Sequence, residues 1–199
     1  MFSDSRIING EYMMQTTTSK YLRELLKRYR ANFDITEQYS LGGQIYPAYA
    51  KFFSLGEKYV LKKEAKLWSI RAYEHVLFIE TSEITKETLS EIQHTIVNDM
   101  EPDLVRKGEK YPEKDHMCSY LTFVIICEKT PDKELMREIK RFSFDKGYLF
   151  GFRGHSQARI ACAFLDSNIV LTNYAGKELK KLLTNIFTTL SGNKEEKVS

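Results

Sequence analysis

Apolar residues recur with the period of an amphipathic helix in four stretches of the sequence. The helices that this pattern predicts span residues 19–29, 86–100, 131–141 and 176–190. In the first helix the apolar positions fall at i, i+3, i+4 and i+7, namely Leu22, Leu25, Leu26 and Tyr29. Basic residues repeat with the same period on the opposite face, which suits either a solvated surface or a phosphate-binding stripe.

Capping residues indicate where two of these helices begin. Thr85 is suited to be the N-cap of the second helix. Pro102 should end or kink that helix, because proline excludes the residue before it from helical dihedral angles. Thr130 is expected to cap the third helix, with Pro131 in its first turn.

The segments between the helices are rich in β-branched and aromatic residues, which favour strands. The expected strands span residues 45–55, 59–61, 65–72, 76–80, 120–127, 142–152, 159–165 and 169–172. Residues 56–58 and 73–75 are expected to be hairpin connections, which predicts a meander of three or four strands. The run Tyr120–Cys127 is apolar on both faces and predicts a central strand that is covered on both sides.

The order of these elements predicts an α+β fold, with a mixed, mainly antiparallel sheet flanked by about four helices. A chain of 199 residues fits one domain. We expect this domain at residues 19–190, preceded by a flexible N-terminal arm at residues 1–18 and followed by a polar, disordered tail at residues 191–199.

Composition and charge narrow the function classes. Hydrophobic residues make up 42% and charged residues 29% of the chain, which excludes a wholly disordered protein. The net charge of +3 is small, so nucleic-acid binding is not expected. Charge is nevertheless segregated: residues 19–30 carry five bases and one acid (+4), residues 80–116 five bases and ten acids (−5), and residues 137–159 six bases and two acids (+4). Opposite poles of this kind would let two copies associate as a homodimer.

The sequence also indicates a compartment. Its three cysteines, Cys118, Cys127 and Cys162, are odd in number and match no disulfide framework, which favours a reducing, cytoplasmic location. Residues 1–15 lack the continuous apolar core of a secretory signal. The strongest apolar run, residues 120–127, is far shorter than the roughly 20 residues of a membrane span. We therefore expect no membrane association.

Common catalytic motifs are absent from the sequence. It contains neither of the glycine-rich phosphate loops, GxxxxGK[ST] and GxGxxG, nor a GxSxG elbow, nor an HExxH zinc motif. His116 and Cys118 could contribute to a metal site, but no second close pair of ligands completes it. We therefore predict no metal, no cofactor and no catalytic cysteine.

One short motif suggests a metal-dependent nuclease. Glu64-Ala65-Lys66 has the E-x-K form on an expected strand, and the order of elements around it resembles restriction-endonuclease-like domains. That resemblance implies a Mg²⁺ ion held by Glu64 and an upstream acid, with Lys66 near the attacked phosphate. Neither Asp34 nor Glu57 fits well as the upstream acid. The alternative explanation is a strand with solvated charges.

The segment Gly151–Arg159 groups hydrogen-bond donors without a carboxylate. In an extended chain, four of its side chains would lie on one face: Arg153, His155, Gln157 and Arg159. Two guanidinium groups and an imidazole could hold the phosphate or carboxylate of a small anionic ligand. Alternatively, these residues pair with acidic groups of the same molecule or of a second copy.

Several scattered motifs resemble an uncharacterised bacterial domain family over about residues 19–187. They include Tyr21-Leu-x-x-Leu25, Phe33-Asp34-Ile35, Ala50-Lys-x-Phe53, Glu57-Lys58-Tyr59, Phe150-Gly-Phe-Arg-Gly154, Arg159, Asp166 and Thr172-Asn173. The resemblance implies a bacterial protein with one domain, and it implies no activity, cofactor or catalytic residue. We therefore expect a soluble cytosolic protein that acts as a binding or interaction module, for a small anionic ligand or a protein partner, rather than as an enzyme.

Overall fold

A seven-stranded sheet forms the middle layer of the protein in the computed structural model, which describes residues 17–58 and 68–195. The strands are β1 (Asp34–Leu41), β2 (Gln44–Lys58), β3 (Trp68–Thr81), β4 (His116–Cys127), β5 (Asp145–Gly147), β6 (His155–Phe164) and β7 (Ile169–Thr172). Their order is β1-β2-β3-β4-β6-β5, and β7 pairs with β6. The pairs β3–β4 and β4–β6 are parallel and the other pairs are antiparallel.

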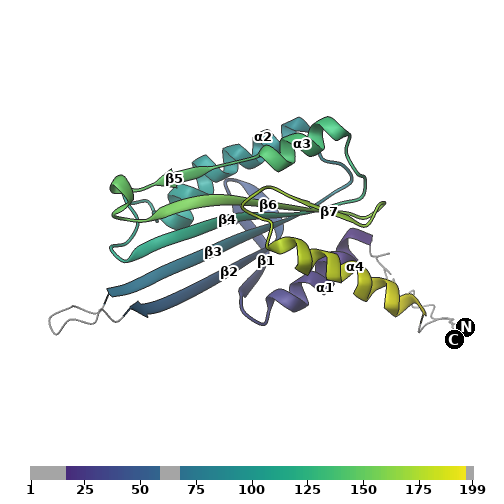
Figure 1. The fold of residues 1–199 in the computed structure, drawn as a ribbon, viewed down its shortest axis with the longest axis horizontal. Coiled ribbons are helices and arrows are strands. Elements are labelled where there is room, and N and C mark those ends of the chain that lie inside the picture. Colours follow the sequence, from purple (N-terminus) through teal and green to yellow (C-terminus); the bar gives the residue numbers. More distant parts are fainter. Residues whose placement is uncertain (1–16, 59–67, 196–199) are drawn as a thin grey trace, which may run out of the picture.

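Helices cover both faces of this sheet (Figure 1). They are α1 (Thr17–Tyr29), α2 (Lys86–Thr95), α3 (Lys133–Arg141) and α4 (Leu179–Glu195), with the π-helical segment η1 (Ile96–Val105) directly after α2 and the short 3₁₀ turn η2 (Leu149–Gly151) before β6. α2, η1 and α3 lie on one face, and α1 and α4 lie on the other. This arrangement confirms the expected α+β fold with its mixed, mainly antiparallel sheet.

Each face of the sheet has its own apolar core, because side chains alternate along a strand. On the α2 face, Leu77 and Phe123 pack with Ile92 and Ile139. On the α1 face, Val76, Phe78 and Val124 pack with leucines of α1 and with Ile186 of α4. The run from Leu121 to Cys127 is fully buried, as expected for a strand covered on both sides.

The first and last helices pack directly against each other. The Tyr21 hydroxyl donates a hydrogen bond of 2.6 Å to the carbonyl oxygen of Leu183. The rings of Tyr21 and Phe187 lie 5.0 Å apart between centroids. The layer on the α1 face is therefore closed by two segments from opposite ends of the described chain.

The strand boundaries differ from the expected ones at two hairpin connections. Residues 73–75 lie inside β3, where they pair with β2 on one side and with β4 on the other, so the hairpin predicted there is wrong. β2 extends to Lys58, so residues 56–58 are part of a strand. β1 was not predicted. The strand expected at residues 142–152 is reduced to β5 and the η2 turn. The segments expected at 59–61 and 65–67 lie outside the described residues.

The helix boundaries also differ in detail. Pro102 does not end the second helical segment, because the chain changes at Ile96 to wider π-helical turns that continue past Pro102 to Val105, and Arg106 N donates a bond of 3.1 Å to Glu101 O. Thr85 is the N-cap of α2, as predicted. The N-cap of α3 is Asp132 rather than Thr130, because its carboxylate accepts a bond of 2.8 Å from Leu135 N. Within the described residues, no helix has both the length and the apolar character of a membrane span.

Candidate functional site

The predicted anion-binding residues are distributed over strand β6 and the loop before it. β6 begins at His155, so His155, Gln157 and Arg159 alternate onto one face, beside Cys118, Tyr120 and Thr122 of β4. Arg153 lies in the preceding loop, and its Nη1 donates a bond of 2.9 Å to the carbonyl oxygen of Pro112. The structure therefore brings three of the four predicted side chains to one face and places Arg153 elsewhere.

Arg159 is buried among partners from its own sheet. Its guanidinium carbon lies 3.3 Å from the centroid of the Tyr120 ring, and Nη1 lies 3.4 Å from Glu74 Oε1. The same Glu74 oxygen accepts a bond of 2.8 Å from the Thr122 hydroxyl. Arg159 Nε has no hydrogen-bond partner among the described residues. Because Glu74 offsets the charge of Arg159, this geometry favours internal pairing over an open anion receptor.

The residues of the nuclease hypothesis, Glu64 and Lys66, lie outside the described residues, so that hypothesis stays a prediction. In the part of the chain that the structure describes, no group of three or more His, Cys, Asp or Glu side chains is placed to hold a metal ion. Both ring nitrogens of His116 are already hydrogen bonded, Nδ1 to Arg153 O at 2.8 Å and Nε2 to Ser119 Oγ at 2.9 Å.

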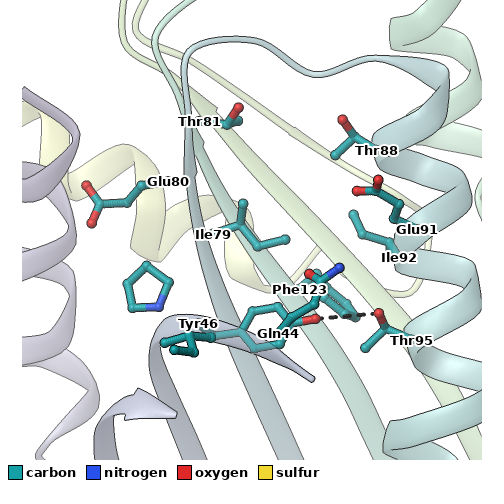
Figure 2. Close-up of a pocket in the computed structure, with 12 residues that line it drawn as sticks. Gln44, Tyr46, Ile79, Glu80, Thr81, Thr88, Glu91, Ile92, Thr95 and Phe123 are labelled. Carbon is teal, nitrogen blue, oxygen red and sulfur yellow. Dashed lines mark hydrogen bonds between the residues drawn. The ribbon is translucent and has the colours of Figure 1, made fainter. Parts of the chain in front are cut away.

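A groove of about 350 Å³ lies between α2 and the strands β2 and β3 (Figure 2). We call it the α2 groove. Its walls are partly apolar, through Ile45, Tyr46, Pro47, Ile79, Ile92 and Phe123. Its polar lining residues are Gln44, Glu80, Thr81, Thr88, Glu91 and Thr95. In Figure 2 the labelled side chains of α2 face Ile79 and Tyr46 across the groove.

The base of the α2 groove is formed by buried side chains. Tyr46, Ile92 and Phe123 are buried, whereas Ile45, whose side chain alternates with that of Tyr46 along β2, is 70% exposed. The Tyr46 hydroxyl and Thr95 Oγ1 lie 3.5 Å apart and join the strand side of the groove to the helix side. The result is an open groove with a fixed apolar floor.

Carboxylates make the α2 groove electronegative. Glu91 is exposed at its rim, and the Asp99 carboxylate lies against Gly42 in the turn between β1 and β2. Neither acid forms an ion pair within residues 17–58 and 68–195. The pKa of Tyr46 is raised, chiefly by burial and also by the carboxylates of Asp99 and Glu91, whereas its bond with Thr95 acts in the opposite direction.

At the other end of the sheet, residues 148–154 form a projecting turn that we call the aromatic loop. Phe150 is 100% exposed, Phe152 81% and Leu149 40%. Leu149 and Phe150 both adopt positive φ angles, of 49° and 52°, which are unusual for large side chains. Large apolar side chains held in solvent in this way are typical of interaction sites.

The base of the aromatic loop is firmly held. The buried Tyr148 hydroxyl bonds to Glu101 Oε1 at 2.9 Å and to Ser156 Oγ at 2.8 Å. Tyr148 N donates to Gly154 O at 2.9 Å, which closes the loop. A Cβ atom at Gly154 would lie 2.2 Å from the carbonyl oxygen of Met117, so only glycine fits there. The loop therefore presents Phe150 from a defined position.

Sequence reasoning missed both of these surfaces. The α2 groove joins residues of four elements, β2, β3, α2 and β4, and no local pattern connects them. For the aromatic loop a local pattern was present, because the consecutive apolar residues Tyr148, Leu149 and Phe150 break the alternation expected of a half-exposed strand. Two phenylalanines beside glycines could have been interpreted as an exposed turn.

Comparison with known proteins gives one match. A family model described as "Domain of unknown function (DUF8052)" matches residues 17–185, from the first residue of α1 into α4. No curated protein and no solved structure was found to match the chain.

Proposed function

The chain belongs to the DUF8052 family of domains of unknown function, and we propose that it is a non-enzymatic binding module whose site is the α2 groove. Its ligand in this proposal is a protein segment that carries a large apolar side chain next to a basic one. The observation that carries the proposal is the apolar floor of Tyr46, Ile79 and Phe123 beside the carboxylate of Glu91, which forms no ion pair among the described residues.

The size of the groove supports this choice of ligand. Its volume of about 350 Å³ is near the lower end for small-molecule sites, which run from about 300 to 1,000 Å³. It is also open on one side, so a small molecule would stay partly in water. One large side chain presented by a protein segment would fill the groove, and the rim of the groove would cover the backbone of that segment.

The electrostatics support a basic neighbour for that side chain. Glu91 lines the groove, and neither Glu91 nor the nearby Asp99 forms an ion pair with the described part of the chain. Complementary charge at the rim of an interface speeds association and fixes orientation. A lysine or arginine beside the apolar residue would satisfy Glu91, whereas an acidic segment would be repelled.

We also propose a bacterial cytoplasmic location. Cys127 and Cys162 are buried free thiols on the adjacent strands β4 and β6, as is usual in a reducing compartment. The scattered sequence motifs that resemble a bacterial domain family support the bacterial origin.

The dipeptide N-acetyl-Phe-Arg-amide is a suitable probe, titrated into ¹⁵N-labelled protein and followed by NMR. We expect the amide signals of Thr88, Glu91 and Thr95 to move, and that of the exposed residue Tyr174, which does not line the groove, to stay unchanged. N-acetyl-Ala-Arg-amide, which lacks the ring, should bind at least about fivefold more weakly, because the apolar burial is lost.

Charge variants complete this test. Glu91→Gln should weaken dipeptide binding about threefold, the size expected for one exposed charge pair. Glu109→Gln is the matched control, because Glu109 is also exposed but lies in the loop between η1 and β4. The proposed site would be refuted if the amide signals that shift did not include residues of the α2 groove. It would also be refuted if no signal shifted up to about 10 mM dipeptide, a concentration at which even weak binding is detected.

A further inference from the structure

The aromatic loop carries the chemistry that the α2 groove accepts. Phe150 is fully exposed and is followed by Phe152 and Arg153. The groove offers an apolar floor and the acid Glu91, for which the described part of the chain supplies no ion pair. We therefore propose that the occupant of the α2 groove is the aromatic loop of a second copy of this chain, with the Phe150 ring on the groove floor; this inference rests on the proposed function.

Charge at the two surfaces supports this partner. The loop, residues 148–154, carries Arg153 and no acid. The lining residues of the groove include the acids Glu80 and Glu91, and the described ones include no lysine or arginine. Two copies that meet loop to groove therefore bring a base to acids, whereas groove-to-groove contacts would bring like charges together.

The loop and the groove of one copy cannot meet each other. The loop ends next to His155, which pairs with Cys118 at the start of β4, whereas Ile79 of the groove pairs with Ile125 near the end of β4. Seven residues of strand separate these positions, which is about 23 Å at 3.3 Å per residue. Figure 1 shows the start of β6 and its β7 end on opposite sides of the molecule. The contact is therefore between copies.

The contact is also heterologous, because it joins two different surfaces. Each copy keeps a free loop at one end of the assembly and a free groove at the other, so the same contact repeats into a ring or a chain of copies. A twofold-symmetric dimer would form only if the loop of each copy entered the groove of the other copy at the same time.

The loop is prepared for such a contact before binding. Two hydrogen bonds hold Leu149 and Phe150 in their left-handed conformations. Tyr148 N donates to Gly154 O, and the Tyr148 hydroxyl donates to Glu101. Left-handed conformations cost roughly 1–2 kcal/mol at a non-glycine residue, so the fold maintains them against that cost. A loop that is already ordered loses less entropy on binding.

Sedimentation velocity of the full chain over a range of concentrations tests this inference. We expect concentration-dependent association that Phe150→Ser weakens at least about 30-fold, as for the loss of a central aromatic anchor. Glu91→Lys should also abolish it by placing a positive charge in the groove. Tyr174→Ser is the matched control, because Tyr174 is an exposed aromatic residue, at 82%, that lies outside both surfaces; it should associate as the wild type does.

Mixing the two variants gives the sharpest result. Phe150→Ser keeps an intact groove and Glu91→Lys keeps an intact loop, so an equimolar mixture should form a heterodimer with one contact, although neither variant associates alone. A wild-type chain that stays monomeric, a Phe150→Ser variant that associates normally, or a mixture that stays monomeric would overturn the inference. Dipeptide binding to the groove is measured independently, so these outcomes do not by themselves remove the proposed function.

Discussion

Replacing Glu101 with glutamine tests how the aromatic loop is held. Glu101 is only 1% exposed and accepts bonds from Arg106 Nε at 2.7 Å, Lys146 Nζ at 2.9 Å and the Tyr148 hydroxyl at 2.9 Å. Glutamine has the same shape, but it is neutral and directs an amide group toward these donors. Breaking a buried ion pair costs about 3–5 kcal/mol, and we expect about 3 kcal/mol because the amide oxygen keeps one bond.

Urea denaturation at about pH 7 measures this loss directly, and thermal melting should show it as a decrease of roughly 6–12 °C, at about 2–4 °C per kcal/mol for a domain of this size. Glu109→Gln changes an exposed acid of the following loop, and we expect it to stay within about 0.5 kcal/mol of the wild type. Phe150 should also become less ordered in Glu101→Gln, which would weaken self-association.

The pH dependence gives an independent check. Burial raises the pKa of Glu101, but the bonds from Arg106, Lys146 and Tyr148 together outweigh burial, so the pKa lies below its ordinary value of 4.5. A carboxyl group with a lowered pKa stabilises the folded state fully above its unfolded pKa and loses this effect as the pH falls through the folded value. The difference between wild type and Glu101→Gln should therefore shrink below about pH 4.5. A difference that is absent at about pH 7, or that stays constant down to about pH 3, would refute this reasoning.

Four further predictions follow from individual residues. Gly154→Ala should destabilise the fold by more than about 2 kcal/mol in the same urea denaturation assay, because φ is +72° and the new Cβ would lie 2.2 Å from a backbone oxygen of β4. Gly151→Ala should cost only about 1 kcal/mol, because φ is +89° but no atom lies within 4 Å of the new Cβ. Burial, with a smaller contribution from nearby cations, lowers the pKa of His75 to about 4. The neutral imidazole therefore stabilises the fold fully above about pH 6.5, and this stabilisation is lost as the pH falls toward 4. An NMR titration of His75 with a midpoint above about pH 6 would contradict the prediction. Plasmid DNA incubated with the protein and Mg²⁺ should stay intact, and cleavage that Glu64→Ala abolishes would instead support the nuclease hypothesis. A thermal-shift panel of nucleotides and sugar phosphates should show no stabilisation that Arg153→Ala removes, and such a loss would support the anion-ligand hypothesis.

Local patterns predicted the fold class because most elements are periodic or continuously apolar. The four helices and the strand at Tyr120–Cys127 were found for this reason. The prediction was wrong at residues 73–75, because Glu74 and His75 are polar residues in the middle of a strand. Each is compensated by a distant residue: Glu74 by Arg159, and His75 by a 2.6 Å hydrogen bond to the Tyr49 hydroxyl. Such partners cannot be recognised in the local sequence.

The candidate site was less predictable than the fold. The donors of β6 were recognised as a group, but the carboxylate of Glu74 that faces Arg159 comes from a strand 85 residues earlier in the chain. The α2 groove depends on how far α2 extends over the sheet, which is set by packing. The exposure of Phe150 depends on left-handed backbone angles that its residue type disfavours.

The packing of α1 against α4 has a consequence for biosynthesis. Tyr21 reaches its acceptor on Leu183 across 162 positions of the chain, so a ribosome must finish nearly the whole domain before the first helix finds its neighbour. Until then, the apolar surface of Val76, Phe78 and Val124 stays incompletely covered. A nascent chain that stalls or is cut before α4 would present this surface to chaperones and proteases, and quality control should remove such fragments quickly.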